Sequence, residues 1–139
     1  MSAALRLEAE TGLAGLAAAQ ARLADWLTAR GATQRLQDRA ALVTEEVVLN
    51  IGMHGFDDTS PHPLAIEARL DGAALTLTFE DAARDFDPVA APARPLPQHL
   101  EDAPVGGLGL VLLRRMTDAL SHEPRPGGGN RLTAVIRAD

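Results

Sequence analysis

The sequence contains no lysine, so arginine supplies all 13 of its basic residues. A P-loop places a lysine on the β- and γ-phosphates, and the protein-kinase fold needs a lysine on one of its strands. Covalent catalysis through a lysine Schiff base needs the same amine. The absence of lysine therefore excludes these three mechanisms, and any nucleotide chemistry must use another route.

Cysteine is also absent, which excludes a disulfide framework and a thiolate metal site and suits a cytoplasmic protein. No segment approaches the roughly 20 apolar residues that a membrane span needs, and the N-terminus lacks the basic and apolar regions of a signal peptide. The net charge of -6 is opposite in sign to the basic face that direct nucleic-acid binding favours. We therefore expect a single domain without a membrane or nucleic-acid partner.

The first half of the chain shows the periodicity of one strand and two helices. Weak alternation in residues 3–9 predicts an edge strand. Apolar residues at helical spacing predict a first helix between Thr11, expected as its N-cap, and Gly31, expected as its C-cap. A second helix is predicted over residues 34–53, with an apolar seam that should face the core.

The second half begins with a predicted hairpin. Residues 62–70 alternate between apolar and polar, Asp71-Gly72 is a strong signal for a two-residue turn, and the return strand ends at Asp81. Residues 82–105 lack periodicity and contain five of the nine prolines, so we expect a long loop of the kind that often forms a lid.

A further helix is predicted to begin at the glycines near residue 106 and to bury a stripe of four residues: Leu108, Leu112, Met116 and Leu120. After a run of glycines, a final strand is predicted from Arg131 to Arg137 as part of a closing hairpin. The order is strand, two helices, hairpin, long loop, helix and hairpin. This order predicts an α+β fold, a two-layer sandwich in which helices cover one face of a mixed, mostly antiparallel sheet.

Three polar residues follow one another at intervals of four in the stretch EEVVLNIGMHG of the second predicted helix. Because residues i and i+4 share a helix face, Glu46, Asn50 and His54 should form one stripe beside the apolar seam. The stripe could consist of solvated positions on a half-buried helix. Alternatively, the carboxylate and amide oxygens, one turn apart, could hold Mg²⁺, which prefers oxygen ligands.

Asp81 ends a predicted strand whose neighbours on the same face are apolar, so its carboxylate should point toward the inner layer. Aspartate is almost never fully buried unless it is paired. The side chain could bend out to water or cap a turn. It could instead lie at the bottom of a pocket and accept a hydrogen bond from an exocyclic amine.

The stretch VGGLGL places three glycines at the start of a predicted helix: Gly106, Gly107 and Gly109. Glycines permit close backbone approach, and a helix N-terminus offers free N–H groups to phosphate. The glycines could equally serve as a plain hinge. Their place after a long loop favours a nucleotide lid around residues 88–107.

Together, these motifs resemble a known family. E-x-x-x-N on a helix, a strand-end D-x-x-x-x-F-D-P, G-G-L-G-L and the closing NRLTAVI are similar to the Bergerat-fold ATPase superfamily shared by gyrase, heat-shock chaperones and sensor histidine kinases. The spacing and the FDP motif more closely resemble the stand-alone anti-sigma-factor serine/threonine kinases of bacteria. The resemblance spans nearly the whole chain and implies one histidine-kinase-like ATPase domain over residues 1–139.

The resemblance implies a role for each candidate residue except His54. Asn50 would ligate the Mg²⁺ that bridges the phosphates of ATP, and Glu46 would be the general base that accepts the proton of the phosphorylated hydroxyl. Asp81 would accept a hydrogen bond from the adenine amine, and Thr133 would support adenine from the last strand. The phosphates would contact the three glycines, Gly106, Gly107 and Gly109.

One position departs from the family pattern. The adenine motif of the family reads D-x-G, whereas Ala83 stands at the glycine position here. Alanine adds a methyl group and disfavours a positive φ, so the departure implies that nucleotide binding is weakened or reshaped. Restoring glycine at this position is then expected to tighten binding.

The function that the resemblance implies is that of an ATP-dependent serine/threonine protein kinase and anti-sigma factor. Its partners would be a sigma factor and an anti-anti-sigma protein of STAS type, which the kinase would phosphorylate in a partner-switching system. The resemblance also implies a homodimer through the first helix. The alternative is a catalytically weak module of the same fold that binds nucleotide and sequesters a partner, which Ala83 favours and intact Glu46 and Asn50 disfavour.

Overall fold

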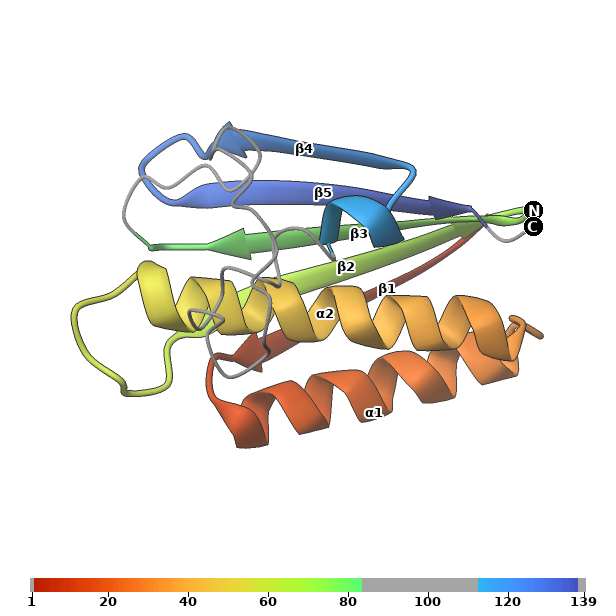
Figure 1. The fold of residues 1–139 in the computed structure, drawn as a ribbon, viewed down its shortest axis with the longest axis horizontal. Helices are drawn as coiled ribbons and strands as arrows, with labels where there is room; N and C mark the ends of the chain where they lie inside the picture. Colours follow the sequence, from red (N-terminus) through yellow and green to blue (C-terminus); the bar gives the residue numbers. More distant parts are fainter. Residues whose placement is uncertain (1, 84–112, 138–139) are drawn as a thin grey trace, which may run out of the picture.

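Five antiparallel strands form one sheet in the order β1-β2-β3-β5-β4, and two long helices cover one of its faces (Figure 1). The strands are β1 (Ser2–Glu10), β2 (Pro63–Asp71), β3 (Ala74–Asp81), β4 (Ala119–Pro124) and β5 (Asn130–Arg137). The helices are α1 (Leu13–Ala29) and α2 (Gln34–His54). This arrangement confirms the predicted α+β sandwich with β1 as an edge strand, and the strand pairs are antiparallel throughout the described residues.

The computed structural model describes residues 2–83 and 113–137. The predicted loop and nucleotide lid, the FDP motif and the glycine group Gly106, Gly107 and Gly109 lie outside these ranges. The single domain over residues 1–139 therefore stays a prediction. Within the described ranges, no helix is long and apolar enough to cross a membrane.

Helix α1 begins differently from the prediction, because Thr11 is not its N-cap. Gly12 occupies the N-cap position, and no side chain caps the helix there. The Thr11 hydroxyl instead accepts a hydrogen bond from the backbone N–H of His62 (2.8 Å), and the Thr11 N–H donates to the His62 carbonyl (2.9 Å). These two bonds satisfy the buried Thr11 and join the end of β1 to the start of β2.

The C-terminal end of α1 lies one residue from the prediction, because Arg30 rather than Gly31 is its C-cap. Gly31 follows the C-cap residue and has a left-handed φ of 76°. Its N–H donates to the carbonyl of Thr28, and the N–H of Ala32 donates to the carbonyl of Leu27. This pair of bonds is a Schellman motif, which explains why glycine ends the helix.

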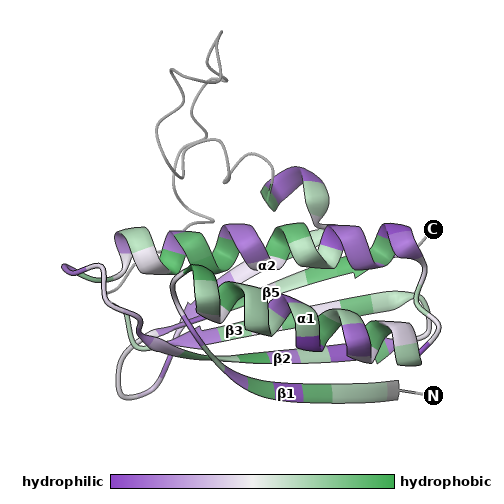
Figure 2. Cartoon of the chain, turned by 90° about the horizontal axis from the view of Figure 1, so that it is seen from below, coloured by the Kyte–Doolittle hydropathy of each residue, from purple (hydrophilic) through white to green (hydrophobic). Residues whose placement is uncertain are grey.

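Helix α2 follows its predicted range to within one residue. The Thr33 hydroxyl caps its start by accepting a hydrogen bond from the N–H of Leu36 (3.2 Å). Its apolar seam is buried as predicted: Leu36, Ala40, Val43, Val47 and Ile51. Figure 2 shows hydrophobic residues alternating with hydrophilic ones along both helices, as expected of helices that bury one side.

The core lies between these helices and the inner face of the sheet. Every second residue of β3 and β5 is buried on that face, and the largest fully buried side chains include Phe79, Leu27 and Ile66. Burying a side chain of this size stabilises the fold by about 1.5–3 kcal/mol relative to exposure. The same alternation places two polar residues, Asp81 and Asn130, at strand ends on the buried face.

The turn between β2 and β3 is shifted by one residue from the prediction. Asp71 pairs with Ala74, so the two-residue loop is Gly72-Ala73. Gly72 has a φ of 61° at the first loop position, where a hairpin turn favours glycine. The glycine was therefore identified correctly, although its place in the turn was not.

The helix predicted from residue 106 does not extend to Leu120. A helical turn covers residues 113–116, and β4 begins at Ala119. The N–H of Asp118 donates to the carbonyl of Val135 (2.7 Å), and β4 then pairs with β5. Half-buried Leu120 satisfies both a helical stripe and strand alternation, so spacing alone extended the helix too far.

Candidate functional site

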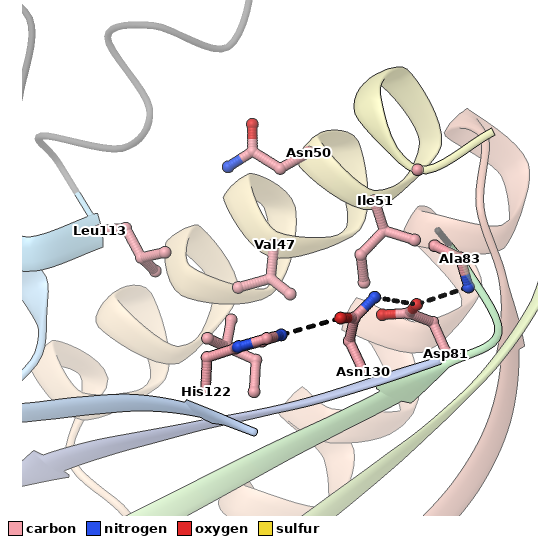
Figure 3. A pocket seen from close by; sticks show the side chains of 10 residues that line it. Val47, Asn50, Ile51, Asp81, Ala83, Leu113, His122 and Asn130 are labelled. Carbon is pink, nitrogen blue, oxygen red and sulfur yellow. Dashed lines mark hydrogen bonds between the residues drawn. The ribbon is translucent and has the colours of Figure 1, made fainter. Parts of the chain in front are cut away.

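A pocket opens between α2 and the strand ends of β3 and β5 (Figure 3). About 400 Å³ of space lies between its lining atoms and in its opening to solvent. The lining consists of five apolar side chains, one glycine and four polar side chains: Val47, Ile51, Ala83, Leu113 and Leu132; Gly55; Asn50, Asp81, His122 and Asn130. Apolar walls with a few polar groups suit a planar ring that carries a small number of hydrogen-bonding atoms.

The carboxylate of Asp81 lies in this pocket, as the strand alternation predicts, and the residue is only 4% exposed. Its Oδ1 accepts hydrogen bonds from the N–H of Ala83 (2.8 Å) and from Nδ2 of Asn130 (3.2 Å) (Figure 3). Its Oδ2 accepts no hydrogen bond from any residue in the described ranges. One carboxylate oxygen is thus used to hold the side chain, and the other can serve a ligand.

Asn130 and His122 extend this hydrogen-bonded network, and the sequence motifs assigned no role to either residue. Nε2 of His122 lies 2.8 Å from Oδ1 of Asn130, which links β4 to β5 and β5 to Asp81 on β3 (Figure 3). Asn130 was missed because the last strand was predicted to begin one residue later. Counting back by twos from buried Leu132 would have placed it on the inner face.

The backbone carbonyl of Asp81 also has specific contacts, which come from the loop between β4 and β5. Nη1 of Arg125, in the loop between β4 and β5, donates to the Asp81 carbonyl oxygen (3.0 Å). A side chain at Gly129 would collide with that same oxygen, and Gly129 has a φ of 97°. Glycine is therefore required at this position both for its backbone conformation and for the close approach of the hairpin to Asp81.

Ala83 fits its position, although the family pattern has glycine there. No residue other than glycine has a positive φ in the described part of the chain, so Ala83 is not strained. Its methyl group is buried and faces Gly55, where an added Cβ would lie 2.5 Å from that of Ala83. The extra methyl group of residue 83 is thus accommodated by the absence of a side chain at residue 55.

The structure brings one member of the predicted helical stripe into the pocket. Asn50 lines the pocket and is 5% exposed, whereas Glu46 and His54 are not among the lining residues. Figure 3 shows the Asn50 amide standing apart from the network of Asp81 and Asn130. Within the described residues this amide makes no side-chain hydrogen bond, so it can serve a ligand or a metal ion.

Glu46 lies one turn before Asn50 on α2 and is half-buried. Partial burial, and to a lesser extent the neighbouring carboxylate of Glu45, raise the pKa of Glu46 above its ordinary value of 4.5. A carboxyl group whose pKa is raised is a stronger base once it is ionised. This property suits proton transfer, for which the best base has a pKa near the working pH.

Thr133 does not reach the pocket, which corrects the role that the resemblance implied for it. Burial along β5 alternates from buried Asn130, so Thr133 belongs to the opposite face of the sheet. Its partners in the two neighbouring strands are Thr78 and Ser121. The polar side chain that the last strand contributes to the pocket is that of Asn130, three residues earlier.

A divalent cation would have few protein ligands here. No group of three or more histidine, cysteine, aspartate and glutamate side chains that could hold a metal occurs in the part of the chain that the structure describes. Mg²⁺ commonly binds through one or two protein oxygens together with substrate phosphates and water. The amide oxygen of Asn50 fits that mode of binding, and a closed protein-only metal site is not supported.

Comparison with known proteins agrees with this geometry. The histidine kinase-like ATPase domain family matches residues 9–136, from the end of β1 to the end of β5. The chain is also similar to Serine/threonine-protein kinase BtrW of Bordetella bronchiseptica. The two are 34% identical over 99 residues, which cover 71% of this chain and 69% of that protein. The chain therefore belongs to the family of histidine kinase-like ATPase domains, and ATP is the ligand that this family implies.

Proposed function

We propose that the chain is an ATP-dependent serine/threonine protein kinase that also acts as an anti-sigma factor in the cytoplasm. Its substrate would be an anti-anti-sigma protein of STAS type, whose phosphorylation leaves the kinase able to hold its sigma factor. The observation that carries the proposal is the pocket itself, in which a buried Asp81 carboxylate lies between apolar walls and Asn50 lines another part of the same pocket. The similarity to a protein named a serine/threonine kinase supports the choice of reaction.

Adenine fits the pocket because the two surfaces are complementary. Val47, Ile51 and Leu132 offer apolar contacts to the faces of a purine ring. Oδ2 of Asp81 can accept a hydrogen bond from the exocyclic amine of adenine, whereas guanine presents a carbonyl oxygen at that position. Ionised aspartate can only accept hydrogen bonds, so the pocket should favour adenine.

Mg²⁺ would be held by the amide oxygen of Asn50 together with the phosphates of ATP. When bound, the ion neutralises charge on the phosphates, which is a large part of catalysis of phosphoryl transfer. Glu46 would take the proton from the serine or threonine hydroxyl of the substrate. The hydroxyl oxygen forms a bond to the γ-phosphorus, the bond from that phosphorus to the bridging oxygen breaks, and ADP leaves.

The test uses labelled ATP, Mg²⁺ and candidate STAS proteins from the same genome. Glu46→Gln should still bind ATP but transfer phosphate about 10²–10⁴-fold more slowly, since it loses the general base. Asn50→Ala should lose Mg²⁺-dependent nucleotide binding together with transfer. Glu45→Gln is the matched control, because Glu45 is the half-buried neighbour of Glu46 on α2. It should change transfer only slightly, through its smaller effect on the pKa of Glu46.

The raised pKa of Glu46 gives a second test. Glu46 accepts a proton only when it is ionised, so transfer should decline as the pH falls through its raised pKa, at a pH above 4.5. Because the folded state binds this proton more tightly than the unfolded chain, Glu46 favours folding at low pH and this advantage is lost as the pH rises. Glu46→Gln should therefore be slightly more stable than wild type near neutral pH and equally stable at low pH.

The second candidate function is a module of the same fold that binds nucleotide and captures a partner without useful turnover. The observation that favours it is that Glu46 does not line the pocket. In that case wild type would bind ATP and a sigma factor yet transfer no phosphate to any STAS protein, and Glu46→Gln would behave like wild type. If Glu46→Gln and Asn50→Ala both unfold, the stripe on α2 is structural and neither assignment of roles holds.

A further inference from the structure

We propose that His122 and Asn130 are positioning residues that set the base preference of the pocket by fixing the carboxylate of Asp81. The inference rests on the proposed binding of a purine nucleotide in that pocket and names the side chains that make it selective. The sequence motifs assigned no role to either residue, although Asn130 begins the closing NRLTAVI stretch. Both lie on the hairpin of β4 and β5 rather than on the strand that carries the aspartate.

The hydrogen-bonding groups of the network admit one arrangement of donors. An ionised Asp81 carboxylate can only accept, so the Asn130 amide must present its Nδ2 to that carboxylate. The amide oxygen then faces His122, whose Nε2 must carry a proton in order to donate to it at 2.8 Å. The histidine thus supports the amide orientation that the carboxylate requires, and the amide joins the N–H of Ala83 in occupying Oδ1, which leaves Oδ2 for a ligand.

Because the network is buried, the loss of one of its hydrogen bonds is not easily compensated by water. Asp81 and Asn130 are 4% and 5% exposed, so water cannot easily replace a lost partner of either side chain. His122 is half-buried and lies on the edge strand, facing the pocket. If its donor is removed, the Asn130 amide loses one of the contacts that hold it. The Asp81 carboxylate is then held less rigidly through Asn130, while it keeps its charge and its hydrogen bond from the N–H of Ala83.

The loss should appear as reduced selectivity. A fixed Oδ2 discriminates a purine with an exocyclic amine from one with a carbonyl oxygen, because the first donates a hydrogen bond and the second repels the carboxylate. A carboxylate that can turn away from the ligand tolerates the carbonyl better and holds the amine less well. Damage to the fold alone would weaken both ligands together and leave their ratio unchanged.

The experiment compares the affinities of the full chain for ATP and for inosine triphosphate, which has a carbonyl oxygen where adenine has its amine. His122→Leu removes the donor, whereas His122→Gln keeps an N–H group near the position of Nε2. Ser121→Ala is the matched control, because Ser121 precedes His122 on β4 and is exposed on the other face. Thermal unfolding is measured on every variant.

In wild type, ATP should bind more tightly than inosine triphosphate. The ratio of the two affinities should fall by about threefold to tenfold in His122→Leu, which is the usual worth of one hydrogen bond. His122→Gln should restore most of the ratio, and Ser121→Ala should leave it unchanged. An unchanged ratio in folded His122→Leu overturns this inference alone, whereas wild type that binds neither nucleotide overturns the proposed function.

A measurement on wild type keeps the inference testable even if His122→Leu does not fold. Nitrogen NMR of the histidine rings distinguishes a proton on Nε2 from a proton on Nδ1. The network requires a proton on Nε2 of His122, both when the ring is neutral and when it is charged. A neutral ring that carries its proton on Nδ1 alone would overturn the inference.

Discussion

Two clusters in this chain combine a carboxylate, a histidine and one further polar side chain, yet they differ in place and in burial. The pocket cluster consists of Asp81, Asn130 and His122, and the loop cluster consists of Asp58, Ser60 and His62. The pocket cluster joins β3, β4 and β5 through two hydrogen bonds, one of them between residues 49 apart in the sequence, and Asp81 is buried. The loop cluster lies entirely between α2 and β2, and its carboxylate side chain is 64% exposed.

The loop cluster has the residue types of a hydrolytic triad without the geometry. Oδ1 of Asp58 lies 2.6 Å from the Ser60 hydroxyl and 2.7 Å from Nε2 of His62, and that hydroxyl lies 3.3 Å from the same Nε2. A triad needs the carboxylate and the serine at opposite nitrogens of the imidazole. The ring of His62 also stacks on Phe56, with 3.7 Å between centroids. The hydrogen bonds and ring stacking of this cluster therefore stabilise the loop conformation.

The difference shows that residue type and proximity do not identify a site. In the loop cluster, the side chains of Asp58, Ser60 and His62 bond, among the described residues, only to residues within four positions of one another, and solvent competes for these contacts. In the pocket cluster, long-range contacts bury the carboxylate and leave one of its oxygens for a ligand. Burial, long-range support and an unused acceptor are the properties that separate the two, and the following variants test that separation.

The largest effect is expected at Gly129, on which the pocket cluster depends for its close backbone approach. Gly129→Ala should lower the free energy of unfolding by about 2–6 kcal/mol, because it adds a collision with the Asp81 carbonyl to an unfavourable backbone conformation. Gly127→Ala is the control: its φ of 86° is also positive, but an added Cβ there would meet no atom within 4 Å. It should cost only about 1–3 kcal/mol in denaturant unfolding. Equal losses of unfolding free energy in the two variants would show that a Cβ at residue 129 does not collide with the Asp81 carbonyl.

The next effect compares the two carboxylates directly. Asp81→Asn should weaken ATP binding by more than about tenfold, because it loses a hydrogen bond to a charged acceptor. Asp58→Asn should leave the affinity unchanged, since Asp58 is exposed and does not line the pocket. Calorimetric titration of both variants with ATP would check this difference. Equal affinities in wild type and Asp81→Asn would remove Asp81 from the binding site.

A smaller effect is expected at Ala83, where the structure changes the expectation drawn from the sequence. Ala83→Gly should lower the free energy of unfolding by about 1–2 kcal/mol, since it removes a buried methyl group and adds freedom to the unfolded chain. It should not tighten nucleotide binding, because the backbone of residue 83 has no need of a positive φ. Tighter binding by Ala83→Gly would show instead that the methyl group obstructs the ligand. Denaturant unfolding and ATP titration of the same sample decide between the two.

The smallest effect concerns the pH dependence of the loop cluster. Hydrogen bonds from Ser60, and then from His62, lower the pKa of Asp58 below its ordinary value of 3.8. A carboxyl group whose pKa is lowered in the folded state stabilises the fold above its unfolded pKa, and this contribution is lost as the pH falls through the folded value. Wild type should thus be only slightly more stable than Asp58→Asn near neutral pH. Thermal unfolding at decreasing pH should show the difference vanish below 3.8, and high salt should reduce it throughout.

The sequence predicted those parts of the fold and site that depend on local pattern. Alternation along β3 placed Asp81 on the inner face, and helical spacing placed Asn50 beside the buried seam of α2. Thr133 was assigned from the resemblance against its own alternation, which sets it on the outer face of β5. His122 could not have been found, because nothing local marks a short edge strand as facing a pocket. Its role comes from contacts that only the assembled sheet creates.

The sheet order also has a consequence for the course of folding. β2 and β3 are joined by a two-residue loop, whereas β1 reaches β2 only after both helices, and Asn130 meets Asp81 across a separation of 49 residues. Contacts between distant residues form slowly, because a long loop must close before they contribute. We therefore expect the β2–β3 hairpin to be structured early in the folding transition state and the pocket to be completed late. ATP would then slow unfolding of the finished protein without accelerating its folding.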